Sequence, residues 1–259
     1  MFGPRLKHSA PLRVFFATGV ICLLGAPAAI ADDLPDPAKP GPYPVGVTTI
    51  TLVDHDRTDV RSGGPRSLLT EIWYPAVDEA KSLPKNKYSD FLMRGQVPVY
   101  RAALEFAFNA KAANIDELFD NDAIRDAPVR EGKFPLIVFS HGNRSIRMQS
   151  TFWCDHMASH GYIVVAADHT GNAAVTIVDG QLVLFKEEEI EQAQVYRPQD
   201  VKFLIDSMQR LSKGEDSRFA GRVDMEHIGA AGHSFGGYTV TQAIEIDPRI
   251  KAIVPMAST

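Results

Sequence analysis

The sequence predicts an α/β protein with a mostly parallel β-sheet. In the second half of the chain, short and uniformly apolar segments alternate with segments of helical character. Uniformly apolar runs are typical of strands buried on both faces, as in parallel sheets covered by helices. The chain has 259 residues, of which 45% are hydrophobic and 23% are charged. This length and composition suit one large globular domain better than two small ones.

Residues 1–31 have the pattern of a secretory signal peptide. Basic residues precede an apolar run over residues 14–24, and Ala29-Ile30-Ala31 supplies the small residues that signal peptidases recognise. The run is too short to be a membrane anchor, since a span needs about 20 apolar residues. We therefore expect cleavage before Asp32, export to the periplasm or the exterior, and no transmembrane segment in the mature chain.

The mature chain is expected to be acidic. Loss of residues 1–31 takes the net charge from −5 to −8, because that segment holds three basic residues and no acidic one. Nucleic-acid binding needs a basic surface, so this function is not expected. Only one of the two cysteines, Cys154, would remain, which excludes an internal disulfide. We expect it to be a small buried apolar residue.

The domain itself is expected to span residues 45–259, after a proline-rich lead-in over residues 32–44. Residues 47–53 and 68–74 have the composition of strands, and a Gly-Gly-Pro turn signal lies between them. They are predicted to form an antiparallel pair at the edge of the sheet. Residues 76–132 are interpreted as a partly helical insertion that either shapes a substrate pocket or packs as an ordinary helix.

The regular part of the pattern follows. The apolar runs predicted to be parallel strands are residues 136–139, 162–167, 228–231 and 250–256. The helical segments that separate them are residues 145–159, 198–211 and 238–246.

The motif Gly232-His233-Ser234-Phe235-Gly236 indicates nucleophilic chemistry. It fits G-x-S-x-G and stands between a strand-like and a helix-like segment, which is the context that gives the pattern meaning. The serine then occupies the apex of a sharp turn, and glycine fills the outer places because side chains would collide there. Ser234 is the predicted nucleophile, and an incidental serine in a glycine-rich turn is the alternative.

A second motif, Phe139-Ser140-His141-Gly142-Asn143, directly follows the first parallel strand. In this architecture the loop after that strand and the residue after the nucleophile each supply one backbone N–H to an oxyanion hole, which predicts Asn143 and Phe235. His141 and His169 lie at predicted strand ends on the same side. We expect His141 to hold its loop by hydrogen bonds and His169 to line the pocket. No cofactor and no metal site is predicted.

Together these residues resemble the bacterial branch of the platelet-activating factor acetylhydrolase family, near the dienelactone-hydrolase-like esterases. The segments that carry the resemblance are Gly41-Pro42-Tyr43-Pro44-Val45-Gly46, Glu71-Ile72-Trp73-Tyr74-Pro75, residues 135–142, Asp168-His169-Thr170-Gly171-Asn172, residues 232–237 and Asp247-Pro248-Arg249-Ile250. The resemblance implies an α/β-hydrolase fold, no metal requirement, and hydrolysis of short acyl esters, including acetyl esters of phospholipids. Dienelactone hydrolases proper use a cysteine where this chain has Ser234.

The sequence departs from that pattern after Ser234. The triad of this fold runs serine, acid, histidine along the chain, yet no histidine follows Ser234. The only later acids, Glu245 and Asp247, precede a strand instead of following one. The chain is interpreted as a fragment that lacks its last strands, its acid and its histidine, because an apolar strand at its end would leave an uncovered edge. A short, non-catalytic relative is the alternative.

The leading functional hypothesis is a secreted serine hydrolase that cleaves a small-molecule or lipid ester through an acyl-serine intermediate. A peptidase or an acyltransferase on the same fold would share Ser234. A non-enzymatic binding protein is the third hypothesis.

Overall fold

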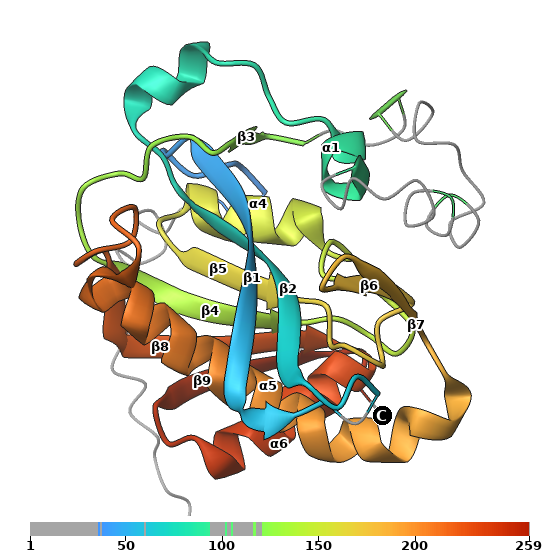
Figure 1. Ribbon diagram of the computed structural model, residues 1–259. Coiled ribbons are helices and arrows are strands. Elements are labelled where there is room, and N and C mark those ends of the chain that lie inside the picture. Colours follow the sequence, from blue (N-terminus) through green and yellow to red (C-terminus); the bar gives the residue numbers. More distant parts are fainter. Residues whose placement is uncertain are drawn as a thin grey trace, which may run out of the picture. The chain divides into compact units, whose positions relative to one another are not determined.

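The structure is a computed structural model that describes residues 36, 38–59, 61–93, 102, 105, 116, 117 and 121–258 (Figure 1). The elements below belong to the unit Ala38–Thr259. The predicted signal peptide lies outside the described residues, as does most of the helix expected within the insertion over residues 76–132.

The centre of the fold is a seven-stranded sheet in the order β3-β1-β2-β5-β4-β8-β9. Its strands are β1 (Val45–Thr58), β2 (Pro65–Pro75), β3 (Ala123–Arg125), β4 (Phe134–Ser140), β5 (Ile163–Ala167), β8 (Val223–His233) and β9 (Ile250–Met256). Strands β5, β4, β8 and β9 are parallel, whereas β2 is antiparallel to both β5 and β1. The predicted α/β fold, with a mostly parallel sheet and an antiparallel N-terminal side, is confirmed. The edge itself is β3, which lies within the predicted insertion and pairs parallel to β1.

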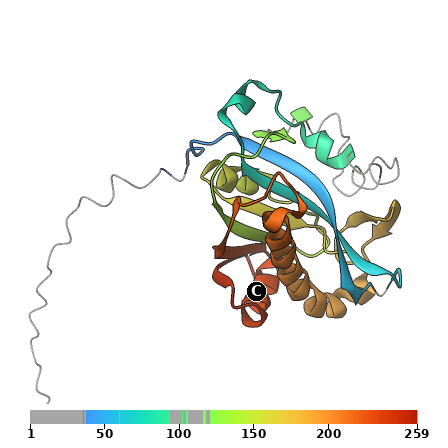
Figure 2. The same ribbon diagram turned by 60° about the vertical axis from the view of Figure 1, so that its left-hand side comes forward.

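Helices cover both faces of this sheet (Figure 1, Figure 2). Helices α5 (Ile190–Arg210) and α6 (Phe235–Ile246) pack on one face, and α4 (Thr151–Ser159) packs on the other. Successive residues of β4 alternate between these two layers: Leu136 and Val138 join the α5 side, while Ile137 and Phe139 join the α4 side. A strand with apolar neighbours on both faces must be apolar at every position, which is why the run was readable from the sequence.

Smaller elements complete the described chain. They are the 3₁₀ turns η2 (Asp78–Ser82) and η3 (Glu187–Glu189), the helix α1 (Tyr88–Met93), the hairpin strands β6 (Val175–Val178) and β7 (Gln181–Leu184), and the turn η4 (Leu211–Glu215). Cys154 lies on α4 as a free, buried thiol, as predicted. Among the described residues, no helix combines the length and apolar character that a membrane crossing requires.

Two helix boundaries differ from the prediction. The helix expected over residues 145–159 begins only at Thr151, because the preceding residues form turns held by ion pairs. Helix α5 begins at Ile190, eight residues before the predicted start. Pro198 was interpreted as a first helical residue, the position that proline favours, but it lies inside the helix.

Candidate active site

Ser234 alone separates strand β8 from helix α6. Its backbone has φ 52° and ψ −120°, a conformation that residues with a side chain rarely adopt and that costs about 1–3 kcal/mol. The backbone N–H of Ser234 donates to the carbonyl oxygen of Met256 on β9 at 2.8 Å. Its side chain is exposed. The surrounding strands therefore hold a strained serine with its hydroxyl accessible.

Glycine is required on both sides of this turn. A Cβ atom on Gly232 would overlap the carbonyl oxygen of Gly236. A Cβ atom on Gly236 would overlap the carbonyl oxygen of Ser140 and lie 2.8 Å from that of His141. Real Cβ atoms essentially never approach other atoms within 3.0 Å. The spacing of the motif thus has the steric cause that the sequence predicted.

The same contact brings the two predicted halves of the oxyanion hole together. Strands β4 and β8 are parallel, with Ser140 opposite Gly232, so the segments that follow them leave the same edge of the sheet. Asn143 lies on the loop after β4, and Phe235 is the first residue of helix α6. Among the hydrogen bonds between described residues, none uses the backbone N–H of Asn143 or Phe235. Both donors are free to receive a ligand, and their oxyanion role stays a prediction.

A buried chain of hydrogen bonds lies beneath the first loop. The hydroxyl of Ser140 donates to Nε2 of His169 at 2.9 Å, and Nδ1 of His169 donates to Asp200 at 2.9 Å. All three side chains are at most 1% exposed. This is a Ser–His–Asp arrangement, but burial excludes substrate from Ser140, so its role is structural.

Charge and burial set the protonation states of the hydrogen-bonded residues His169 and Asp200. Burial alone would raise the pKa of Asp200, but the charge and paired hydrogen bonds of Arg66 outweigh it and hold that pKa far below its usual range. Burial, followed by the charge of Arg197, lowers the pKa of His169 to about 4. The imidazole is therefore neutral near pH 7, with its proton on Nδ1.

His141 is buried as well and shapes the loop from inside. Its Nδ1 donates to the carbonyl oxygen of Gly142 at 2.7 Å, and its Nε2 accepts the backbone N–H of His169 at 3.1 Å. Burial lowers the pKa of His141 well below the ordinary histidine value. His141 thus lies within the segment that leads to Asn143, and His169, which was expected to line the pocket, lies buried beneath it.

Arg197 on α5 was not recognised from the sequence. Its guanidinium is fully buried and donates to the hydroxyl of Ser140 at 2.9 Å, to Asn172 at 2.6 Å, and to the carbonyl oxygen of His141. It also lies 4.6 Å from the centre of the Phe235 ring. Burial lowers the pKa of Arg197 to about 9. A signal was present, because Arg197 shares the apolar stripe of its helix with Val201, four residues on.

Asn172 extends this network to the predicted oxyanion residue. Its side-chain nitrogen donates to the side-chain oxygen of Asn143 at 2.8 Å, and its backbone carbonyl oxygen accepts the backbone N–H of Arg144 at 3.2 Å. Arg197 therefore contacts one oxyanion segment through Asn172 and the other through the ring of Phe235.

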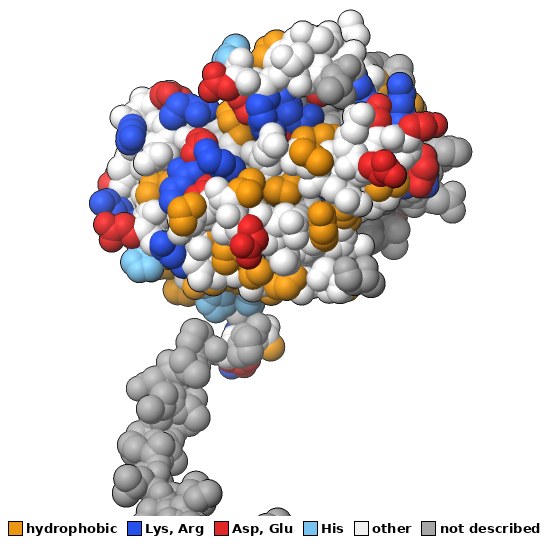
Figure 3. All heavy atoms as spheres, turned by 90° about the horizontal axis from the view of Figure 1, so that it is seen from below, with side chains coloured by type: hydrophobic (Ala, Val, Ile, Leu, Met, Phe, Trp, Pro, Cys, Tyr) orange, Lys and Arg blue, Asp and Glu red, His pale blue; other side chains and the backbone are white. Residues whose placement is uncertain are grey.

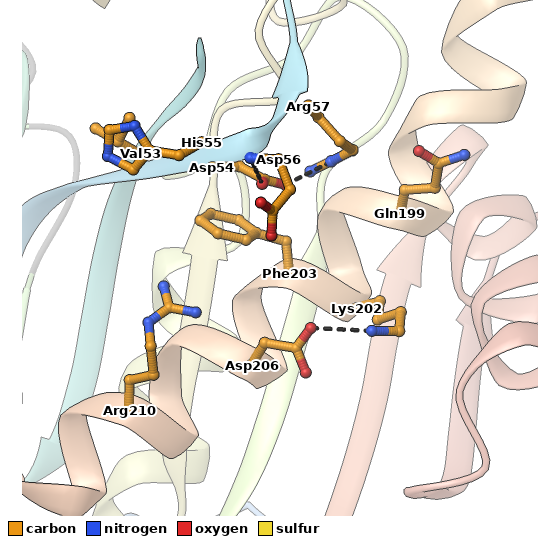
Figure 4. Close-up of a pocket in the computed structure, with 10 residues that line it drawn as sticks. All are labelled: Val53, Asp54, His55, Asp56, Arg57, Gln199, Lys202, Phe203, Asp206 and Arg210. Atoms are coloured by element: carbon orange, nitrogen blue, oxygen red, sulfur yellow. Dashed lines mark hydrogen bonds and ion pairs between the residues drawn. The ribbon is translucent and has the colours of Figure 1, made fainter.

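The cavity between β1 and α5 shares no lining residue with the turn at Ser234 (Figure 4). It measures about 490 Å³, and ion pairs lie along it, Arg57 with Asp54 at 2.5 Å and Lys202 with Asp206 at 3.0 Å. On the face in Figure 3, Lys and Arg side chains likewise lie beside Asp and Glu side chains, between patches of hydrophobic residues. These features offer no competing reactive site.

The sheet order and the strand–serine–helix turn define an α/β-hydrolase. More particularly, the chain belongs to the family described as platelet-activating factor acetylhydrolase, isoform II, whose model matches residues 30–210. That segment exceeds half of the chain and ends before Ser234.

Individual relatives agree with this family. The chain is 28% identical to a probable 1-alkyl-2-acetylglycerophosphocholine esterase of Arthroderma benhamiae, over 90% of this chain and 62% of the relative. It is 25% identical to the platelet-activating factor acetylhydrolase of Gallus gallus, over 83% of this chain and 58% of the relative. A solved ferulic acid esterase from Streptomyces cinnamoneus matches with a TM-score of 0.64 and 27% identity, over 82% of this chain and 59% of that one. The chain thus spans less than two thirds of the length of each.

Proposed function

We propose that the protein is a carboxylic-ester hydrolase in which the hydroxyl of Ser234 attacks the acyl carbon of a small-molecule or lipid ester. The observation that carries this proposal is the exposed serine held at φ 52° between β8 and α6. The activities for which these relatives are named support short acyl esters as substrates, including acetyl esters of phospholipids. The likeness to a ferulic acid esterase favours ester hydrolysis over peptidase or acyltransferase chemistry.

The chemistry assigns a role to each part of the turn. As the oxygen of Ser234 bonds to the acyl carbon, its proton passes to a base and the carbonyl oxygen becomes an oxyanion. The free N–H groups of Asn143 and Phe235 stabilise that charge, and each such donor typically contributes about 3–4 kcal/mol to lowering the barrier. Expulsion of the alcohol leaves an acyl-serine, which water hydrolyses to release the acid and restore the serine.

We propose that the base and its acid partner come from sequence that follows Thr259. Among the hydrogen bonds between described residues, none joins the hydroxyl of Ser234 to a histidine. The greater length of the relatives supports a longer enzyme. So does the apolar surface along β9, where Val254 is 51% exposed and a hollow of about 420 Å³ is lined mainly by hydrophobic residues. Further strands and a helix would cover this surface.

Labelling with a fluorophosphonate tests the nucleophile. In the enzyme expressed to its natural C-terminus, we expect the probe to attach to the peptide that contains Ser234, and Ser234→Ala to abolish the adduct. Ser140→Ala is the matched control, because it removes the serine of the buried Ser140–His169–Asp200 arrangement. Labelling that survives Ser234→Ala but not Ser140→Ala would overturn the assignment. A substrate panel of phospholipid acetyl esters, nitrophenyl acetate and ferulate esters then defines the acyl preference.

Two further measurements test the remaining proposals. Reading the gene past the codon for Thr259 should show an open frame with an acid followed by a histidine, and a stop codon at that point contradicts the fragment proposal. We also propose export with cleavage before Asp32. N-terminal sequencing of the mature protein checks the cleavage site, and an intact Met1 in the exported protein argues against it.

A further inference from the structure

The side chain of Gln149 joins the two segments that lead to the predicted oxyanion donors, the loop after β4 and the end of β8. Its Oε1 accepts the backbone N–H of Gly142 at 2.7 Å, and its Nε2 donates to Nδ1 of His233 at 2.7 Å. Gly142 directly precedes Asn143, and His233 directly precedes Ser234. One amide group therefore bridges the residue before the predicted oxyanion residue Asn143 and the residue before the predicted nucleophile Ser234.

The two loops already touch at this point. A Cβ atom on Gly142 would lie 3.4 Å from Nδ1 of His233, 3.5 Å from its carbonyl oxygen and 3.6 Å from Oε1 of Gln149. The amide of Gln149 thus links two segments that are already close to van der Waals contact. It also satisfies the N–H of Gly142, which would otherwise be an unpaired donor in a partly buried place.

The backbone that presents Gln149 is itself fixed. Arg147, two residues earlier, is fully buried and forms ion pairs with Asp168 at 2.9 Å and Glu71 at 3.2 Å. The backbone N–H of Gln149 donates to the carbonyl oxygen of Ile146 at 3.0 Å. Because these contacts hold the backbone that carries it, the amide of Gln149 is pre-organised.

The bridge also dictates the tautomer of His233. The N–H of Gly142 can be accepted only by the oxygen of the Gln149 amide, which leaves the amide nitrogen facing the imidazole. Since that nitrogen is a donor, Nδ1 of His233 must accept, and the ring proton resides on Nε2. The orientation of the residue before the nucleophile is therefore coupled to the oxyanion loop.

We propose that Gln149 is a positioning residue that sets the spacing between the N–H groups of Asn143 and Phe235. The inference rests on the proposed function, because the oxyanion role of those groups belongs to it. Gln149 contacts neither reacting atom and acts through Gly142 and His233. Displacing a catalytic group by 1 Å costs up to about 10²-fold in rate, so loss of the bridge should slow the reaction of Ser234 by about tenfold or more.

Two substitutions separate positioning from simple loop stability. Gln149→Leu removes both hydrogen bonds at similar volume. Gln149→Glu keeps an acceptor for Gly142, and its second oxygen accepts a proton on Nδ1 of His233 if that ring changes tautomer. Gln181→Leu is the matched control, because this glutamine is exposed on β7.

The test uses the enzyme expressed to its natural C-terminus. It combines the rate of Ser234 labelling by a fluorophosphonate, the ¹⁵N NMR signature of the His233 ring, and hydrogen exchange at the Gly142 amide. We expect Gln149→Leu to slow labelling, to release the tautomer and to speed exchange. Gln149→Glu should switch the proton to Nδ1 and recover most of the rate. Gln181→Leu should stay within about threefold of wild type, as surface substitutions usually do.

The outcomes are distinct. Labelling at the wild-type rate in Gln149→Leu, with the chain still folded, overturns the positioning role. Failure of wild-type Ser234 to react contradicts the proposed function alone. The bridge is then judged on the tautomer of His233 and on exchange at Gly142, and insensitivity of both to Gln149→Leu overturns it.

Discussion

The contact between Gly236 and the end of β4 makes a sharp prediction for Gly236→Ala. The added methyl group would overlap the carbonyl oxygen of Ser140 and lie 2.6 Å from its carbonyl carbon. Ordinary contacts of a Cβ atom begin near 3.4 Å. All the obstructing atoms belong to the backbone, so no side chain can rotate away. The turn at Ser234 and the loop that carries Asn143 must separate by about 1 Å to accept the methyl group.

The separation affects stability and reactivity differently. Forcing an extra methyl group into a packed interior typically costs about 1–3 kcal/mol of unfolding free energy. The same separation of about 1 Å increases the distance between the two predicted oxyanion donors, and a displacement of this size lowers the rate by about 10²-fold. We therefore expect Gly236→Ala to remain folded under mild conditions while its Ser234 reacts about 10²-fold more slowly.

Gly229→Ala is the matched control for this experiment. Gly229 lies on β8, the strand that leads into the turn, and its added Cβ would be 3.6 Å from the carbonyl oxygen of Ala252, an ordinary contact. Urea unfolding measures the loss of stability, and the rate of fluorophosphonate labelling at Ser234 measures reactivity. Equal behaviour of the Gly236→Ala and Gly229→Ala variants on both measurements would refute the steric argument.

Three further predictions follow from burial. The free energy of unfolding should fall as the pH drops from 6.5 toward 4, and His169 should account for about 3 kcal/mol of this loss. The folded state holds the pKa of His169 at about 4, so in this pH range the unfolded chain binds a proton that the folded chain does not. Urea unfolding at pH 7 and pH 4.5 checks this, and His169→Gln should weaken the pH dependence whereas the exposed His227→Gln should not. Arg197→Met should destabilise the fold by about 3 kcal/mol or more, since each buried acceptor left unpaired costs about 1–3 kcal/mol. The same denaturant titration should show Lys202→Met, which breaks an exposed pair, within about 0.5 kcal/mol of wild type. Burial also raises the pKa of the Cys154 thiol well above its ordinary value, so iodoacetamide should modify it only in denaturant, and modification of the native protein at pH 8 would contradict this placement.

The strands were predictable because their signal is local. The run predicted over residues 250–256 coincides with β9, and the run over residues 136–139 lies inside β4. Each residue of a strand buried on both faces is selected for apolar character, so the pattern needs no knowledge of its neighbours. The turn at Ser234 was predictable in part for the same reason, since Gly232 meets the carbonyl oxygen of Gly236 within the motif itself. The obstacles that Gly236 meets, at Ser140 and His141, are distant in sequence.

The support beneath the site was not predictable, because its partners are distant in sequence. Ser140 and His169 are 29 residues apart, and Arg197 lies 57 residues from Ser140. Only the folded sheet brings these side chains together. A buried arginine on an apolar helical stripe signals that a partner exists, but it does not say which residue that partner is.

The turn is fixed from two sides, by β4 through Gly236 and by β9 through the N–H of Ser234. Its geometry therefore does not depend on a base. In enzymes of this kind, loss of a triad member leaves about 10³–10⁴-fold catalysis over water, from the oxyanion hole and substrate binding alone. If the base follows Thr259, a protein of residues 1–259 alone should hydrolyse nitrophenyl acetate at that residual level, and Ser234→Ala should change the rate little. A wild-type rate far above that of Ser234→Ala would place a working base among residues 1–259 and refute the fragment proposal.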